Sequence, residues 1–374
     1  SVSGIKNGDI YSFKGIPFAA PPVGDLRWKA PQPAKNWTGV RKCEAFSASP
    51  IQSKPAPFYC WTEEFIAPPE PLSEDCLYLN VWTGAKVPYE NRPVFVWIYG
   101  GGFSSGSAAC AIYDGAEMAK KGVVFVSINY RVGALGFMAH PELTKEQNNA
   151  SGNYGLLDQI AALKWVQNNI GAFGGDPNNV TIAGQSAGSM SVNCLVASPL
   201  AKRLFHRAIA QSGGMLSNRI TTTLADAEKN GEAFQKKANA ANLAELRKKT
   251  PAEILAATQG IRFGITLDGH VLPTDIYAHF KEGKHNDVPL MAGWVSGDGG
   301  IMGGQALTAE KFKQQAQERY GANAEEFLKL FPAATDEEAK AAQLKVGLLS
   351  FAAMSANLWA SFNKNKSYLY QFTH

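Results

Sequence analysis

The sequence predicts an α/β protein whose mainly parallel sheet is covered by helices on both faces. Short runs rich in β-branched and aromatic residues alternate with segments of helical periodicity. With 45% apolar residues, 18% charged residues and 36 glycines among 374 residues, the composition is that of a folded globular chain. These observations exclude a disordered, collagen-like or coiled-coil protein. No linker divides the sequence, so we expect residues 1–374 to form a single domain.

The predicted strands are short apolar runs bounded by turn residues. They lie at residues 76–82, 94–99, 123–129, 180–183, 208–211, 290–293 and 367–372. Between the third and fourth runs, apolar residues recur at spacings of four, three, three and four, which is typical of one apolar helix face. These residues are Leu156, Ile160, Leu163, Val166 and Ile170.

Two later segments, residues 220–285 and 305–362, are expected to be largely helical excursions over the sheet. In the first, Thr250 precedes Pro251 and is placed to cap a helix. In the second, Thr335 and Glu338 have the spacing of a capping box for a long helix.

The charge balance indicates which partners to expect. The net charge is only +4, and no lysine or arginine run is long enough to follow a phosphate backbone, so we expect no nucleic-acid partner. The most apolar stretches fall short of the roughly 20 residues that span a bilayer, so we expect no membrane span. The sequence does not indicate the oligomeric state.

The five cysteines are an odd number without metal-ligand spacing, and we expect no metal or other cofactor. Cys60 and Cys76 bracket a proline-rich loop at residues 67–72. A disulfide would restrain this loop, but the spacing alone leaves two free buried thiols equally open.

The pattern Gly-x-Ser-x-Gly, which marks a strained turn between a strand and a helix, occurs twice. It lies at residues 102–106 and 184–188, and only the second match has a buried-strand run before it and a helical run after it. There Ser186 would gain from the helix N-terminus, which favours the negative charge that develops during attack on a carbonyl. The alternative is an ordinary turn serine that caps this helix.

Three consecutive glycines at residues 100–102 follow the strand predicted at 94–99. In the plan of serine hydrolases, N–H groups of this early loop and the N–H after the nucleophile, here Ala187, form an oxyanion hole. A flexible loop is the alternative interpretation of these glycines.

Four stretches resemble the signatures of type B carboxylesterases, the group that includes cholinesterases, fungal lipases and bacterial para-nitrobenzyl-type carboxylesterases. They occur in the expected order at residues 13–19, 73–80, 129–131 and 173–188, so the resemblance covers essentially the whole chain.

The resemblance implies an α/β-hydrolase fold, Ser186 as nucleophile, and Gly101, Gly102 and Ala187 as oxyanion donors. The family often has Glu before the nucleophile, whereas this chain has the neutral Gln185. This difference argues against a cationic, choline-like substrate.

The resemblance also favours a Cys60–Cys76 disulfide, and hence an oxidising compartment and a secreted or periplasmic protein. The chain begins with Ser1 rather than Met, so we expect either that a leader was removed or that the sequence starts late.

Asp298 is the candidate triad acid because it follows the strand predicted at 290–293, and chemistry gathers at the carboxyl ends of such strands. Asp287 lies at the wrong end of that strand. The resemblance places Asp298 where the family usually has Glu. The alternative is a turn carboxylate between Gly297 and Gly299.

The general base has no clear candidate. In this fold the order along the chain is serine, acid, histidine, and only His374 follows Asp298. His374 matches a structural histidine of the family rather than the catalytic one. We therefore expect the catalytic histidine beyond residue 374, which means that the hydrolase domain lacks its C-terminal part.

These expectations favour a serine carboxylesterase that forms an acyl-enzyme with a small or medium ester. The alternative from another class is a non-catalytic, cholinesterase-like binding or adhesion module. A third hypothesis is a peptidase or amidase on the same fold.

Overall fold

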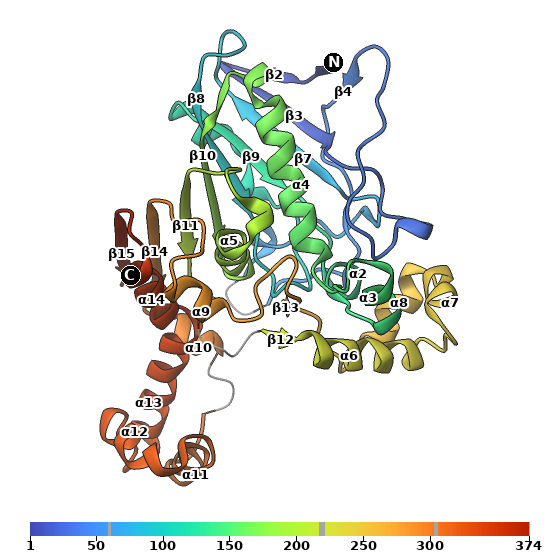
Figure 1. Cartoon of the computed structure of the whole chain (residues 1–374). Helices are drawn as coiled ribbons and strands as arrows, with labels where there is room; N and C mark the ends of the chain where they lie inside the picture. Colours follow the sequence, from blue (N-terminus) through green and yellow to red (C-terminus); the bar gives the residue numbers. More distant parts are fainter. Residues whose placement is uncertain (59–60, 217–220, 303–305, 374) are drawn as a thin grey trace.

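The computed structural model describes residues 1–58, 61–216, 221–302 and 306–373, and its centre is a nine-stranded sheet (Figure 1). The strand order is β15-β14-β11-β10-β8-β9-β7-β3-β2. In chain order the strands are β2 (Ile5–Asn7), β3 (Ile10–Pro17), β7 (Tyr78–Thr83), β8 (Arg92–Ile98), β9 (Val124–Ile128), β10 (Gly175–Gln185), β11 (Arg207–Gln211), β14 (Leu290–Val295) and β15 (Ser367–Phe372).

The six strands from β9 to β15 are parallel, whereas β7, β3 and β2 add an antiparallel edge. The predicted α/β class and mainly parallel sheet are therefore confirmed. The sequence patterns do not predict β2 or β3. Gly15 interrupts β3 with a φ of +73° at a register shift between Phe13 and Ile16, which explains why no regular strand pattern is visible there.

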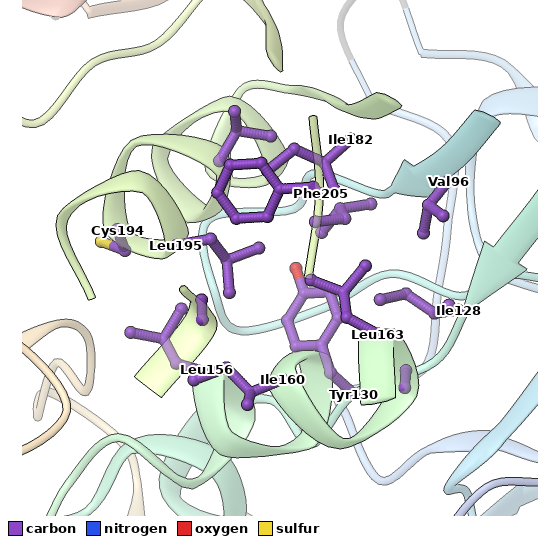
Figure 2. Packing of buried hydrophobic residues seen from close by; sticks show 14 of the residues in the cluster. Val96, Ile128, Tyr130, Leu156, Ile160, Leu163, Ile182, Cys194, Leu195 and Phe205 are labelled. Atoms are coloured by element: carbon purple, nitrogen blue, oxygen red, sulfur yellow. The ribbon is translucent and has the colours of Figure 1, made fainter. Parts of the chain in front are cut away.

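The core lies where α4 (Tyr154–Asn169) and α5 (Ala187–Ala197) cover the sheet. Figure 2 shows Leu156, Ile160 and Leu163 of α4 in the same apolar cluster as Val96 of β8 and Ile182 of β10. The helix predicted from these α4 residues is confirmed, and it positions the end of β10 from which α5 begins.

The remaining elements lie around this core. The other α-helices are α1 (Ala116–Lys120), α2 (Gly133–Phe137), α3 (Pro141–Glu146), α6 (Leu224–Lys237), α7 (Leu243–Lys248), α8 (Pro251–Ala257), α9 (Ile276–Lys281), α10 (Asp298–Met302), α11 (Ala309–Tyr320), α12 (Ala324–Leu330), α13 (Asp336–Leu348) and α14 (Met354–Phe362). The small two-stranded pairs are β1 (Val2–Ser3) with β4 (Arg41–Lys42), β5 (Ser49–Pro50) with β6 (Leu72–Ser73), and β12 (Thr222–Thr223) with β13 (Thr266–Leu267). Helices α11 to α13 project away from the sheet in Figure 1.

The two predicted helix caps differ in the structure. Thr250 and Glu253 form a complete capping box at α8. Thr335 caps α13 by accepting from the N–H of Glu338, but the Glu338 carboxylate accepts from the N–H of Ala334, at 2.7 Å, and no reciprocal box forms. The capping box predicted at α13 is therefore only half correct.

Cys76 carries a buried free thiol, and burial raises its pKa above the usual range. The structure thus does not support the Cys60–Cys76 disulfide, although Cys60 itself lies outside the described residues. The secreted or periplasmic location, which depended on that disulfide, stays a prediction. Over the described ranges, no helix is both long enough and apolar enough to cross a membrane.

Candidate active site

Ser186 occupies the sharp turn between β10 and α5. Its backbone angles, φ of +56° and ψ of −122°, lie in a region that residues other than glycine rarely adopt. Such a strained backbone is typical of a nucleophile elbow. The N–H of Ser186 donates to the carbonyl of Gln211 on the neighbouring strand at 2.9 Å, and its carbonyl accepts from Met190 at 2.9 Å. These bonds connect the turn to β11 and to the first turn of α5. The serine itself is half-buried.

Glycines make this turn sterically feasible. A Cβ atom on Gly184 would lie 2.4 Å from the carbonyl carbon of Gly188, and one on Gly188 would lie 2.0 Å from the carbonyl oxygen of Ile98. On the other side, a Cβ on Gly213 would lie 2.6 Å from the carbonyl oxygen of Ser186. Because backbone atoms cause all three clashes, the elbow tolerates only glycine at these positions.

The glycine loop lies directly against the elbow. A Cβ atom on Gly100 would be 3.0 Å from the Cβ of Ser186. Gly101 and Gly102 adopt φ values of +114° and +62° and are exposed, and among the described residues their N–H groups find no hydrogen-bond acceptor. The N–H of Ala187 belongs to the first turn of α5, where such groups have no partner within the helix. Three unpaired donors thus lie close to the serine.

Two contacts hold this loop in place. The side-chain amide of Gln52 pairs with the backbone of Gly106: its oxygen accepts from the N–H at 2.9 Å and its nitrogen donates to the carbonyl at 2.8 Å. The rings of Tyr99 and Tyr130 stack at 4.4 Å, and the hydroxyl of each donates to the other's carbonyl at 2.9 Å. The role of Gln52 is not predictable from the sequence, because a glutamine between prolines and serines gives no local signal.

The first Gly-x-Ser-x-Gly match has another geometry. The hydroxyl of Ser104 is exposed and donates to the carbonyl of Gly101 at 3.2 Å, within a turn that no helix follows. Ser104 therefore helps to shape the glycine loop, whereas only Ser186 lies between a sheet strand and a helix.

Asp298 begins α10 just after β14 and is 2% exposed. Its Oδ2 accepts from the N–H of Val295 at 3.0 Å. Because β10, β11 and β14 are consecutive strands, Ser186 and Asp298 follow parallel strands about 10 Å apart, which leaves space for an imidazole between them.

Burial, and secondarily the charge of Asp298, raise the pKa of Tyr370 on β15. Asp287 instead accepts N–H bonds from Lys364 and Asn365 in the turn before β15.

The described histidines are engaged elsewhere or exposed. His140 caps α3, and His206 accepts from the N–H of Val180 at 3.2 Å. His285 lies 3.3 Å from Asn363, and burial lowers its pKa. His279 belongs to α9 and His270 is exposed, while His374 lies outside the described residues. None of the five described histidines makes a hydrogen bond to Ser186.

Two buried ion pairs brace the segments around the site. Arg131 is 4% exposed and makes a bidentate contact with Asp158, with nitrogen-to-oxygen distances of 2.8 and 2.7 Å. Arg27 pairs in the same way with Glu74. Neither pair is evident from local sequence patterns, because the partners are 27 and 47 residues apart. Arg131 and Glu74 do lie within quoted family motifs, which was the available signal.

Comparisons with known proteins show which family the chain resembles. A sequence model described as "Carboxylesterase family" matches residues 1–373. Fumonisin B1 esterase of Sphingopyxis macrogoltabida is 42% identical over 351 residues, which cover 91% of this chain and 63% of that protein. Para-nitrobenzyl esterase of Bacillus subtilis (strain 168) is 38% identical over 312 residues, covering 80% of this chain and 61% of that protein. The chain therefore spans less than two thirds of the length of these relatives.

Proposed function

Because the chain belongs to the carboxylesterase family, we propose that the protein it represents is a serine carboxylester hydrolase with Ser186 as its nucleophile. Family membership confirms the resemblance found in the sequence and the α/β-hydrolase fold that it implied. The observation that carries the proposal is the strained Ser186 elbow packed against a glycine loop with unpaired N–H groups.

The reaction follows from this arrangement. The Oγ of Ser186 attacks the ester carbonyl carbon, and the negative charge on the carbonyl oxygen is stabilised by the N–H groups of Gly101, Gly102 and Ala187. The removal of one such donor typically costs about 10²- to 10³-fold in rate. The alcohol leaves, the acyl group stays on Ser186, and a water molecule then releases the acid.

The proposal assigns proton transfer to a histidine outside residues 1–374, with Asp298 orienting its ring. An imidazole between the ends of β10 and β14 would reach the serine on one side and the carboxylate on the other. Both relatives are named as esterases, which supports an ester substrate. Neither relative is named as a non-catalytic binding module.

Covalent labelling tests the nucleophile. The full-length protein is incubated with an alkyl fluorophosphonate, and the modified residue is located by peptide mass spectrometry. We expect one adduct, on Ser186, that disappears in Ser186→Ala and persists in Ser104→Ala, which removes the serine of the other motif. An adduct that persists in Ser186→Ala would refute the assignment. A full-length protein that neither reacts nor cleaves para-nitrophenyl esters would support the binding module instead.

A further inference from the structure

The carbonyl group of Gly101 accepts an unusual number of hydrogen bonds. Among the described residues it has four donors: the N–H groups of Ser104 and Ser105, each at 3.1 Å, and the hydroxyl groups of the same two serines, each at 3.2 Å. A carbonyl oxygen has two lone pairs, so the two N–H groups already satisfy it. The two hydroxyl bonds are additional to what this oxygen needs.

The peptide unit that carries this carbonyl also carries the N–H of Gly102, a candidate oxyanion donor. The peptide bond between Gly101 and Gly102 is trans, and in a trans peptide the C=O and N–H bonds point in opposite directions. Because the carbonyl is turned toward Ser104 and Ser105, the N–H of Gly102 points away from them. Gly102 is exposed, and in the described part of the chain no acceptor binds its N–H. The four donors to Gly101 therefore fix the direction of this N–H.

The peptide unit has little conformational restraint of its own. It lies between two glycines, and glycine adopts positive and negative φ values about equally well, so no side chain of Gly101 or Gly102 prevents the peptide from turning over. A peptide that turned over would present the carbonyl of Gly101 to the ester oxygen in place of the N–H of Gly102. The carbonyl would repel the oxyanion that the N–H stabilises.

The turn that brings the two serines to Gly101 is held by other contacts. Phe103 adopts a φ of +60°, which is rare for residues other than glycine. Its carbonyl accepts from the N–H of Gly133 at 2.7 Å, and its ring, which is 3% exposed, packs against Phe137 with the ring centres 5.1 Å apart. A Cβ atom on Gly101 would lie only 2.3 Å from the carbonyl oxygen of Ser105. The serine backbone is therefore held next to Gly101.

We propose that Ser104 and Ser105 are positioning residues whose hydroxyl groups hold the Gly101–Gly102 peptide with its N–H directed at the ester oxygen. The inference rests on the proposed hydrolase function and extends it to two residues outside the triad and the oxyanion hole. Each hydroxyl bond also polarises the peptide, which makes the N–H of Gly102 a stronger donor. In this role the hydroxyl groups act through the peptide.

Steady-state kinetics of the full-length protein with para-nitrophenyl butyrate tests this inference. The double variant Ser104→Ala/Ser105→Ala removes both hydroxyl groups and leaves the two backbone donors. We expect its kcat to fall by about tenfold, with KM within about twofold, because acylation and deacylation both pass through an oxyanion. The affinity for a trifluoromethyl ketone, which adds to the serine and places an anionic oxygen in the oxyanion hole, should fall by the same factor. Each single alanine variant keeps one hydroxyl donor and should lose about threefold in kcat.

Two matched variants isolate the hydroxyl groups as the cause. The double variant Ser104→Thr/Ser105→Thr keeps both hydroxyl groups and should retain kcat within about threefold. Ser361→Ala, in α14, removes another exposed hydroxyl that donates to a backbone carbonyl, that of Leu358 at 2.7 Å, and should leave kcat and KM unchanged.

The inference is overturned if the double alanine variant keeps its kcat, if its KM rises while kcat stays the same, or if the threonine variant loses as much activity as the alanine variant. If circular dichroism shows that the double alanine variant is not folded, the two single variants decide by the same criteria. Labelling of Ser186 by the fluorophosphonate separates this result from a failure of the proposed function. When the unchanged protein is labelled, these outcomes refute the inference alone. An unchanged protein that neither reacts nor cleaves the ester would refute both.

Discussion

The centre of the sheet and its β14–β15 edge are built differently, although each provides a candidate catalytic residue (Figure 1). At the centre, all 11 residues of α5 are buried against the sheet. At the edge, one face exposes 45% of Met291, 37% of Val295, 51% of Tyr368 and 56% of Phe372. These residues are paired in register, Met291 with Tyr368 and Val295 with Phe372, so they form one open face.

The comparison shows two ways of positioning a reactive side chain. Ser186 is fixed by tight backbone packing on three sides, through Gly184, Gly188 and Gly213. Asp298 lies at the end of a strand whose outer neighbour is half exposed, and a hydrogen bond from Val295 orients it. We therefore expect the serine site to depend on the integrity of the fold and the acid site to depend on the carboxylate itself.

The largest expected effect concerns Asp298. In the full-length protein, Asp298→Asn should lower kcat/KM by about 10³- to 10⁴-fold, because a neutral amide neither fixes the imidazole in the required tautomer nor stabilises the imidazolium that forms. Asp298→Glu should keep activity within about tenfold of the unchanged protein, since only one methylene is added. Thermal unfolding should change little in either variant.

Asp287→Asn is the matched control, because Asp287 lies at the opposite end of β14 and binds the turn before β15. It should leave kcat/KM unchanged. An equal loss in both asparagine variants would mean that Asp298 is a structural turn residue rather than the triad acid.

A substitution at the elbow should mainly cost stability. Gly188→Ala places a Cβ atom 2.0 Å from the carbonyl oxygen of Ile98, and we expect a loss of about 3 kcal/mol in the free energy of unfolding. Gly300→Ala at the edge should cost less than about 1 kcal/mol, because the closest atom to its added Cβ is a Leu344 methyl at 4.0 Å. Urea unfolding measures both, and equal losses would contradict the difference between the two regions.

The parallel part of the fold was predictable because its strands and α4 carry strong local patterns. The spacing of Leu156, Ile160 and Leu163 gives the helix directly, and α5 is bounded by Ser186 and Pro199. The first half of β10 gives no strand pattern, since Asp176, Asn178 and Asn179 are polar and that half pairs with β8 only through Gly175 before a register shift.

The candidate site was predictable only where a motif is contiguous. The elbow and the glycine loop are each a contiguous stretch of sequence, and in the structure Gly100 lies adjacent to Ser186. The clamp by Gln52 joins residues 54 positions apart, and the pair of Arg131 with Asp158 joins residues 27 apart. Such contacts depend on tertiary packing, which periodicity and spacing do not reveal.

A smaller effect is expected at Gln52, which we interpret as a positioning residue for the glycine loop. Gln52→Ala removes both hydrogen bonds to Gly106, and we expect kcat to fall by about tenfold with little change in KM. The affinity for a boronic acid inhibitor, which places an anionic oxygen in the oxyanion hole, should fall in parallel with kcat. Gln314→Ala, at an exposed position of α11, is the control. A rise in KM with unchanged kcat would show that Gln52 affects substrate binding instead.

The smallest effect is expected on the open face of the edge. Phe372→Ala should change the free energy of unfolding of residues 1–374 by less than about 0.5 kcal/mol, because the ring is already 56% exposed. Phe205→Ala, which removes a ring that is 4% exposed in the core, should cost about 3 to 5 kcal/mol. The comparison uses the same substitution, so it isolates burial as the cause of the difference. A cost above about 2 kcal/mol for Phe372→Ala would mean that the ring packs against something in solution, and the edge would then be as well covered as the centre.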